Sequence, residues 1–296
     1  MYDICRTLKA TDVAEALRLF TQYPEAVPVA GGTDVLIHMK ERKLREATLL
    51  SLRDIQELQG IRREEDGTLV IGAGTCFAAI VRNPMLQELV PVLCKACNQV
   101  GSPQIRNVAT IGGNLCNGAV SADSAPSLLV LEAVLQLESA AGTRLVPLTE
   151  FYSGPGKTVL QKGKELLIAI RIPRSGYEGR GAACVKFGQR SAMEIATLGC
   201  AASVALEQDK KTVRELRLAF GVAAPTPVRC PQTEALLTGK PADADWYRML
   251  RRSLLEELSP RESWRASKEL REQLIRELST RTVAEAIENA GGNHND

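Results

Sequence analysis

The chain has 296 residues, which is enough for two domains that each bury a core of their own. Hydrophobic residues make up 45% of the chain and charged residues 24%, so a disordered protein is excluded. The net charge of +2 gives no indication of a nucleic-acid-binding surface.

No apolar run approaches the length of a membrane span, and the first residues, MYDICRTLKATD, lack the basic flank and apolar stretch of a signal peptide. We therefore expect a cytoplasmic protein. The eight cysteines fit a reducing compartment, because they are scattered through apolar segments and do not form the dense pattern of a disulfide-rich secreted domain.

The first part of the chain alternates predicted helices and strands. The stretch TDVAEALRLFTQYP carries an apolar stripe and predicts an amphipathic helix with Thr11 as its cap. A short strand over residues 27–29 ends in the pair Gly31-Gly32, and a second helix is expected directly after it. Further strands are predicted in ATLLSLRDIQEL and TLVIGAGTCF.

A single helix is predicted from about Leu86 to Val100, and it contains the C-x-x-C pair Cys94 and Cys97. Zinc and iron–sulfur sites usually need four ligands at suitable spacing, whereas Cys116 follows only at a distance, no second C-x-x-C or C-x-x-H exists, and the chain has only two histidines. Helical spacing places the pair one turn apart on an apolar face. We therefore interpret both cysteines as core residues and predict no metal site.

The second half of the chain begins after a candidate linker. KELLIAIRIP predicts a strand that ends at Pro173, and the glycine-rich segment RSGYEGRG at 174–181 lacks apolar periodicity, so we expect a domain boundary there. Beyond it, AACVKFGQ, LGCAASVAL and ELRLAFGVA alternate as strands do. Helices are predicted afterwards, the last over about 264–290 with Gly291 as its stop.

Two glycine motifs resemble nucleotide-binding loops but fail on spacing. GPGKT at 154–158 would need a glycine where Phe151 stands to be a P-loop, so it predicts a turn. IGAGTCF supplies Gly72 and Gly74 of a dinucleotide fingerprint, but Phe77 occupies the third glycine position.

Two loops with paired glycines remain, Gly31-Gly32 and Gly112-Gly113, and each follows a short apolar segment. Glycine removes the Cβ and admits unusual backbone conformations, so that main-chain N–H groups can approach a ligand closely. Successive N–H groups form a concave anion site without any lysine, and two such loops could hold a pyrophosphate between them. The alternative is that both are tight turns that happen to contain glycine pairs.

Long segments of the chain resemble the flavin subunits of molybdenum hydroxylases, the family of xanthine dehydrogenase and carbon monoxide dehydrogenase. AGGTDVLIHMK and QIRNVATIGGNLCNGAVSAD are similar to the family's two FAD-binding segments. VKFGQRSAMEIATLGCAA, LRLAFGVAAPTPVRCPQTEALLTGK and SWRASKELREQLIRELSTR resemble its C-terminal domain, so the likeness covers nearly the whole chain. Within the family, the likeness is to flavin subunits of the xanthine dehydrogenase type.

The resemblance implies an α+β fold with a two-lobed FAD-binding domain of the vanillyl-alcohol oxidase (PCMH) type and a smaller α/β C-terminal domain of the carbon monoxide dehydrogenase flavoprotein type. The FAD-binding domain would span residues 1–175, with lobes of about 1–55 and 56–175. A linker at 176–182 and the C-terminal domain at 183–290 would follow, and the FAD would lie between the lobes.

The resemblance also implies which residues bind FAD, with backbone N–H groups as the main donors to the diphosphate. The matching positions are Val29, Ala30, Gly31, Gly32, Thr33, Asp34, Val35, Thr110, Ile111, Gly112, Gly113, Asn114, Asp123, Leu166 and Lys186. Two non-functional alternatives stay open: Asp123 could be the cap of the helix that follows, and Lys186 could be a solvated lysine of a strand. No catalytic residue is identified.

The implied function is electron transfer. A partner subunit would carry the molybdenum cofactor, another partner would carry [2Fe–2S] clusters, and FAD would pass hydride to NAD⁺. The chain lacks the inserted four-cysteine segment that some relatives use for a [4Fe–4S] cluster, so one FAD is the full expected cofactor content. Two alternatives remain: an autonomous flavin oxidase or reductase with its own substrate, and an interaction scaffold that binds no flavin.

Overall fold

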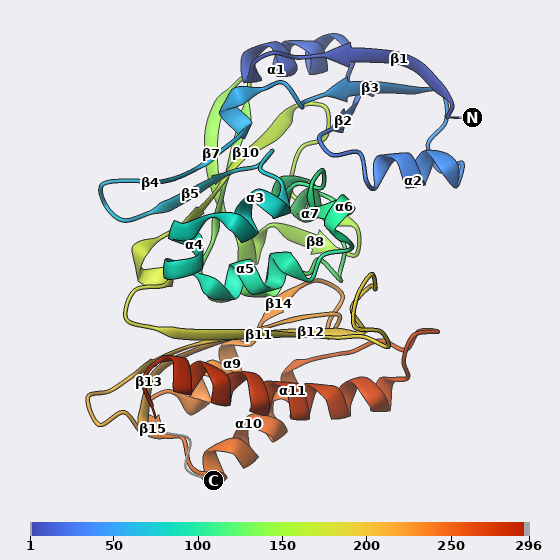
Figure 1. Ribbon diagram of the computed structural model, residues 1–296. Helices are drawn as coiled ribbons and strands as arrows, with labels where there is room; N and C mark the ends of the chain where they lie inside the picture. The colour runs from blue at the N-terminus through green and yellow to red at the C-terminus, as the bar shows by residue number, and fades with distance from the viewer. Residues whose placement is uncertain (1, 293–296) are drawn as a thin grey trace.

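The computed structural model describes residues 2–292, and Figure 1 shows a molecule built from two lobes above a C-terminal domain. The first lobe is a parallel three-stranded sheet. Helices connect its successive strands, as parallel pairing requires. Its elements are β1 (Ile4–Lys9), α1 (Val13–Gln22), β2 (Val27–Val29), α2 (Val35–Lys40) and β3 (Ala47–Ser51), with strand order β1-β3-β2.

Helix α1 forms where the sequence predicted it, but its N-cap is Asp12 and not Thr11. The Asp12 carboxylate accepts a hydrogen bond of 2.7 Å from the Glu15 amide. The Thr11 amide and hydroxyl instead each donate to the Glu15 carboxylate at 2.8 Å. Asp12 thus caps the helix and Glu15 binds the residue before the cap, and an aspartate satisfies the amide at the helix start as well as a threonine would.

The second lobe is an antiparallel sheet in the order β4-β5-β10-β6-β7, covered by short helices. The strands are β4 (Ile61–Arg63), β5 (Leu69–Gly72), β6 (Val134–Ser139), β7 (Gly142–Pro147) and β10 (Glu165–Ile172), with η1 (Gln56–Leu58) leading in. The helices are α3 (Phe77–Arg82), α4 (Pro84–Leu89), α5 (Pro91–Asn98), α6 (Pro103–Arg106), α7 (Ile111–Cys116) and α8 (Ala125–Val130).

The single helix predicted from Leu86 to Val100 is wrong, because the chain forms α4 and α5 with Val90 between them. Pro91 has no N–H to continue α4 and instead occupies the first turn of α5, where that donor is not needed. The turn predicted at GPGKT is confirmed: it joins β8 (Tyr152–Gly154) to β9 (Lys157–Thr158).

The C-terminal domain is an antiparallel sheet with helices on one face. Its strands are β11 (Gly181–Phe187), β12 (Leu198–Leu206), β13 (Thr212–Gly221), β14 (Val228–Arg229) and β15 (Lys240–Pro241), and its helices are α9 (Pro231–Leu237), α10 (Ala244–Glu257) and α11 (Lys268–Asn289). The chain enters it through η3 (Arg174–Gly176) and Tyr177, whose hydroxyl donates to the Gly67 carbonyl at 2.6 Å. Where one domain ends and the next begins stays a prediction.

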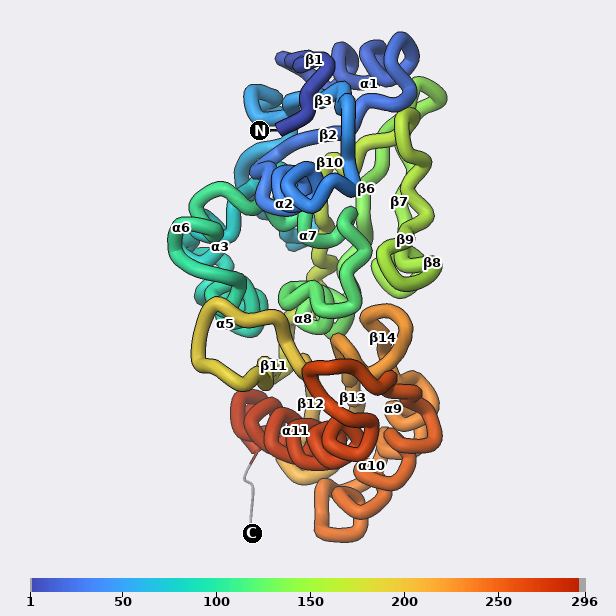
Figure 2. Tube along the Cα trace, turned by 90° about the vertical axis from the view of Figure 1, so that its right-hand side faces the viewer, coloured from blue at the N-terminus to red at the C-terminus, as the bar shows by residue number. Residues whose placement is uncertain are grey.

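The other face of the C-terminal sheet packs on α5 and α8 of the second lobe, as Figure 2 shows from the side. One apolar core therefore runs from the second lobe into this sheet and includes Cys184, Ala201 and Ala219. Cys94 and Cys97 lie in this core at 8% and 0% exposure. Burial raises the pKa of the Cys94 thiol to about 11, which keeps it protonated and unreactive at neutral pH.

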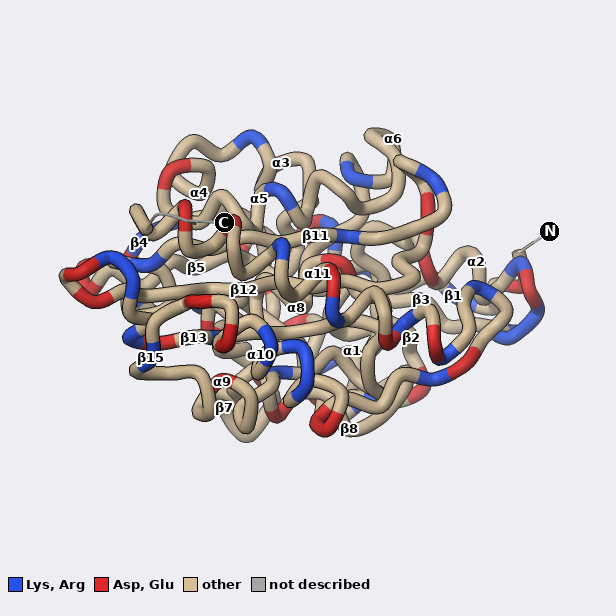
Figure 3. The backbone as a smooth tube through the Cα atoms, turned by 90° about the horizontal axis from the view of Figure 1, so that it is seen from below, with Lys and Arg blue, Asp and Glu red and all other residues tan. Residues whose placement is uncertain are grey.

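Basic and acidic residues are interspersed along the backbone in Figure 3, without long segments of one sign. This distribution agrees with the small net charge of the chain. No helix within residues 2–292 combines the length and hydrophobicity needed to cross a bilayer.

Candidate functional site

A cavity of about 310 Å³ lies where the first lobe meets the second, within the size range of small-molecule sites. Most predicted site residues line it, and they come from both paired-glycine loops and from β10: Ala30, Gly31, Gly32, Thr33, Asp34, Val35, Thr110, Gly112, Gly113, Asn114 and Leu166. Val29 and Ile111 instead pack into hydrophobic clusters beside it. Asp123 and Lys186 lie elsewhere.

The first glycine loop keeps its main-chain donors available. Within residues 2–292, the amides of residues 31–35 donate to no backbone or side-chain acceptor. Gly32 has φ of +72°, which glycine adopts without strain. Gly31 lies so close to the second loop that a Cβ there would be 2.0 Å from the Val108 carbonyl oxygen. The loop is thus shaped to present successive N–H groups to an anion.

The second glycine loop does not fit the expectation that its amides are free. The amide of Ile111 donates to the Thr75 carbonyl at 3.1 Å, and that of Gly112 donates to the Ala73 carbonyl at 2.9 Å. The Gly113 amide donates to the Thr110 hydroxyl at 3.1 Å, which caps α7. A Cβ on Gly112 would be 2.6 Å from Ala73, so this glycine allows close packing, and its amide already has an acceptor.

Side chains of the second loop supply the remaining polar groups. The Asn114 Oδ1 accepts a bond of 2.7 Å from the Ser124 hydroxyl, which fixes the amide, while its Nδ2 has no partner within the described chain. The Thr110 hydroxyl also borders the cavity. Asn114 and Thr110 can therefore donate where the glycine amides of this loop cannot.

The cavity contains no basic side chain other than His38 among the described residues that line it. Its acids are Asp34 and Glu165. The Arg144 guanidinium binds Glu165 at 2.7 and 2.9 Å and, with the Gln161 amide, lowers the pKa of that carboxyl, so Glu165 is a satisfied ion pair. Since no lysine or arginine is among the described residues of this lining, backbone N–H dipoles can supply positive potential for a bound anion.

The turn after β5 is a third wall that the sequence analysis set aside. Ala73, Gly74 and Phe77 line the cavity, and all belong to the segment IGAGTCF. At Gly74 a Cβ would be 3.0 Å from the Leu58 carbonyl oxygen and 2.5 Å from the movable end of the Gln59 side chain, so this glycine is closely surrounded. The glycine after a buried strand was the sequence signal that could have identified this wall of the cavity, although the segment is not a dinucleotide fingerprint.

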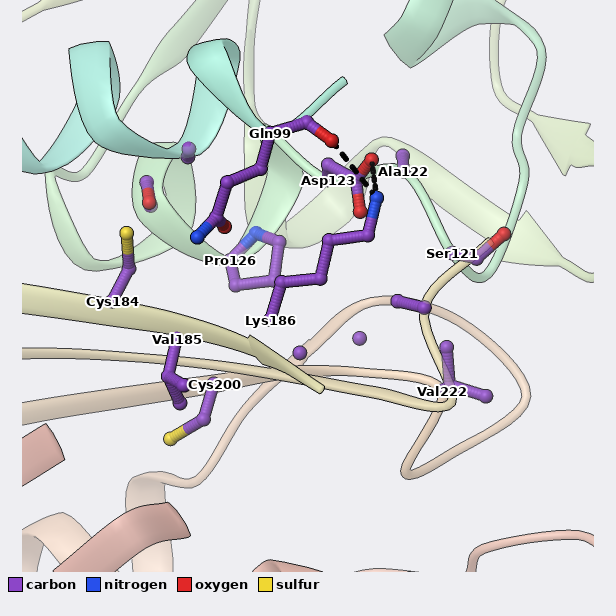
Figure 4. A pocket seen from close by; sticks show the side chains of 15 residues that line it. Gln99, Ser121, Ala122, Asp123, Pro126, Cys184, Val185, Lys186, Cys200 and Val222 are labelled. Carbon is purple, nitrogen blue, oxygen red and sulfur yellow. Dashed lines mark hydrogen bonds and ion pairs between the residues drawn. The ribbon is translucent and has the colours of Figure 1, made fainter. Parts of the chain in front are cut away.

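Asp123 and Lys186 meet in a separate, nearly filled cavity of about 20 Å³ between the second lobe and the C-terminal sheet, shown in Figure 4. The Lys186 ammonium lies 2.7 Å from the Asp123 carboxylate and donates to the Gln99 carbonyl at 3.0 Å. Each side chain of the pair is 13% exposed. Burial raises the pKa of the Asp123 carboxyl to about 6, although Lys186 acts in the opposite direction.

Both non-functional alternatives for this pair, a solvated lysine and a helix cap, are wrong. Lys186 is a largely buried ion-pair partner and not a solvated lysine. Asp123 does not cap α8, because the N-cap position is Ser124. The pair instead links the second lobe to β11, and residues 63 positions apart in the chain form it.

Comparison with known proteins assigns the family. Residues 3–175 match the family model described as the FAD binding domain in molybdopterin dehydrogenase, and residues 183–286 match the CO dehydrogenase flavoprotein C-terminal domain. The chain is 42% identical to the putative xanthine dehydrogenase FAD-binding subunit of Escherichia coli strain K12 over 99% of both chains. It is 33% identical to the nicotinate dehydrogenase FAD-subunit of Eubacterium barkeri over 77% of both chains.

The fold agrees with this assignment. A chain of the carbon monoxide dehydrogenase of Hydrogenophaga pseudoflava superposes with a TM-score of 0.92 and 29% identity, covering 98% of this chain and 99% of that one. The expected two-lobed FAD-binding domain with a C-terminal flavoprotein domain is thus confirmed. The chain belongs to the family of FAD-binding oxidoreductase subunits of molybdenum hydroxylases.

Proposed function

We propose that this chain is the electron-transfer subunit of a xanthine dehydrogenase-like complex. It would hold one FAD, take electrons from [2Fe–2S] clusters of a partner subunit and pass hydride to NAD⁺. Identity of 42% to a putative xanthine dehydrogenase FAD-binding subunit over the whole chain supports this choice within the family. The same proposal places the protein in the cytoplasm, where its eight free cysteines stay reduced.

The row of unpartnered amides at residues 31–35 carries the proposal for the cofactor site. FAD has an anionic diphosphate, and these amides belong to residues that line a cavity whose described lining contains no lysine or arginine. Thr110 and Asn114 would add side-chain donors, whereas Gly31 and Gly112 would keep the walls close. The residues present therefore fit the group.

We also propose that Asp123 and Lys186 contact the cofactor, as the likeness to the family implies. The two side chains already bind each other. A polar atom of the cofactor that replaced one partner would therefore exchange one hydrogen bond for another. Leu166 would contribute apolar contact, because it lines the main cavity and is 3% exposed. The proposed domains are 1–175, with lobes of about 1–55 and 56–175, and 183–290, joined at 176–182.

When bound, FAD supplies the conversion between single-electron transfer and hydride transfer, and this chain orients it and sets its electrostatic surroundings. No group of His, Cys, Asp or Glu side chains in the described part of the chain could hold a metal ion. The molybdenum cofactor and the clusters are accordingly proposed to reside on two partner subunits, with a purine such as xanthine as the hydroxylated substrate.

The test is to purify the chain from its own host with its complexes intact and to measure flavin, iron and molybdenum together with NADH formation from xanthine and NAD⁺. We expect an absorption band at about 450 nm, both metals, and NADH. Flavin on a single chain that oxidises a substrate without partners would favour an autonomous oxidase or reductase. A complete complex that reduces only an artificial dye would overturn the choice of NAD⁺.

A further inference from the structure

Ser124 is a fully buried residue that binds a lining residue of the main cavity without lining that cavity itself. It is 0% exposed, and the only hydrogen bond of its hydroxyl in the described chain is the 2.7 Å bond to Asn114 Oδ1. Asn114 lines the cavity. The hydroxyl of Ser124 can therefore influence a ligand in this cavity only through Asn114.

The Ser124 hydroxyl does not play the role that its position in the chain favours. Ser124 is the N-cap residue of α8, where a serine hydroxyl usually accepts a hydrogen bond from an amide of the first turn. No side-chain capping bond forms at this helix. The hydroxyl instead donates to Asn114, ten positions earlier in the chain. The contact of this side chain is thus with the cavity wall and not with its own helix.

The bond selects one of the two orientations of the Asn114 amide. A hydroxyl can donate or accept, so an amide that was turned over could offer Nδ2 to Ser124. The hydroxyl proton would then have no acceptor in the described chain, and a buried polar group without a partner is costly. With Oδ1 bound, Nδ2 has no partner, yet it is not one of the buried unsatisfied atoms of residues 2–292. Nδ2 is therefore an accessible donor.

The segment that carries Ser124 is held by the C-terminal sheet, which contributes no described residue to the main cavity. Lys186 of β11 binds the neighbouring Asp123 at 2.7 Å. The Val222 amide, directly after β13, donates to the Val120 carbonyl at 3.2 Å. Val222 makes this bond at φ of +67°, a conformation that a β-branched residue rarely adopts. Ser124 is thus fixed independently of Asn114 and can orient it.

We propose that Ser124 is a positioning residue of the FAD site, which holds the Asn114 amide so that Nδ2 donates to the cofactor. This inference rests on the proposed FAD site and adds a residue that acts through another. A donor that is already held in its bound orientation loses less freedom on binding, so the serine should raise FAD affinity. Without it, the amide could turn over and present Oδ1, an acceptor that an anionic diphosphate repels.

The test is a double-mutant cycle of Ser124→Ala and Asn114→Ala, with FAD affinity measured by fluorescence titration of the full-length apoprotein. We expect Ser124→Ala to weaken FAD binding about tenfold by itself and less than about twofold in the Asn114→Ala background. Ser127→Ala is the matched control, because Ser127 lies one turn further along α8, is 1% exposed and donates to the Val92 carbonyl at 3.5 Å. It should change FAD affinity less than about twofold.

A second measurement reports on the hydrogen bond itself. Asn114→Asp keeps an acceptor for Ser124 and removes the N–H donor, so FAD should bind more tightly once the new carboxyl is protonated. A hydroxyl that donates to a carboxylate lowers its pKa. Adding Ser124→Ala should therefore raise the pH midpoint of FAD binding by about one unit. A role of Ser124 in packing alone would leave this midpoint in place.

Equal losses of FAD affinity from Ser124→Ala in both backgrounds, an equal loss in Ser127→Ala, or an unmoved midpoint would overturn the inference. So would a Ser124→Ala chain that is less stable but binds FAD as tightly as the wild type. Should Ser124→Ala fail to fold, Ser124→Gly removes the same hydroxyl, and glycine is accepted at N-cap positions. A wild-type chain that binds no FAD would instead refute the proposed cofactor site, whereas failure of the NAD⁺ proposal would leave these affinities unaffected.

Discussion

The two paired-glycine loops look alike in sequence, but their main-chain amides differ in whether they have hydrogen-bond acceptors within the chain. Gly31-Gly32 opens a stretch whose amides, from residue 31 to residue 35, bind nothing within the described chain. Gly112-Gly113 begins α7, and both of its amides are already bound, to the Ala73 carbonyl and the Thr110 hydroxyl. A glycine pair therefore indicates that the backbone comes close to something, but it does not say whether that is a ligand or another part of the chain.

The difference follows from where the two loops lie. The second loop is packed between the first loop and the turn after β5, so the carbonyls of Ala73 and Thr75 reach its amides. The first loop packs against Val108 on one side only and faces the cavity on the other. We therefore expect the main-chain donors of the first loop to bind the anion in the proposed FAD site, and the second loop to position the first.

Gly31→Ala should have the largest effect. The new Cβ would be 2.0 Å from the Val108 carbonyl oxygen, which forces the loops apart at a cost of about 3 kcal/mol. We expect FAD affinity to fall at least about a hundredfold, measured by fluorescence titration of the apoprotein.

Gly32→Ala changes the next residue of the first loop. Gly156→Ala is its matched control, because the two glycines have similar positive φ, +72° at Gly32 and +69° at Gly156. Each substitution should cost about 1–2 kcal/mol of stability from backbone strain. Only Gly32→Ala should also weaken FAD binding, because Gly156 lies in the turn between β8 and β9. Equal FAD affinity in all three variants would refute the assignment of the first loop.

Gly112→Ala and Gly113→Ala separate packing from conformational freedom in the second loop. At Gly112 a Cβ would be 2.6 Å from Ala73, so we expect a loss of about 2 kcal/mol in the free energy of unfolding and weaker FAD binding. At Gly113 the nearest atom would be the Thr110 hydroxyl oxygen at 3.0 Å, and alanine favours helix, so stability should stay within about 1 kcal/mol. Urea unfolding measures the free energy of unfolding of both variants. Equal values would contradict the prediction.

Asp123 should produce a pH dependence that neither loop has. Burial raises the pKa of its carboxyl to about 6 in the folded chain, so the folded state binds this proton more tightly than the unfolded state. Its contribution to the free energy of unfolding should therefore fall by roughly 3 kcal/mol as pH rises from about 3 to about 7, and change no further above that. The difference between wild type and Asp123→Asn measures it, and a flat difference would contradict the prediction.

Salt should have the smallest effect. No lysine or arginine lines the main cavity among the described residues, and Lys186, the proposed basic contact, is only 13% exposed, so FAD binding should depend on buried groups that salt screens little. We expect the dissociation constant to change less than about twofold between about 50 and 500 mM NaCl. A loss of tenfold or more would show that basic side chains outside the cavity hold the cofactor.

Much of the local structure could be predicted from the sequence. The apolar periodicity of α1, the strand at β10 that ends at Pro173 and the long helix α11 all follow from neighbouring residues. Errors arose where two local rules competed: Asp12 outweighed Thr11 as a cap, and Pro91 divided one predicted helix into two. Most predicted site residues do line one cavity, because the glycine loops that carry them are local features.

Tertiary structure alone decided which donors stay available. The acceptors of the Ile111 and Gly112 amides, Thr75 and Ala73, lie in a turn that is distant in sequence, so no local pattern marks those amides as used. The Asp123–Lys186 pair likewise forms only when β11 folds against the loop before α8. Sequence determined which segments can form strands, turns and helices, whereas hydrogen-bond partners depend on long-range packing, which brings together groups that the chain order keeps apart.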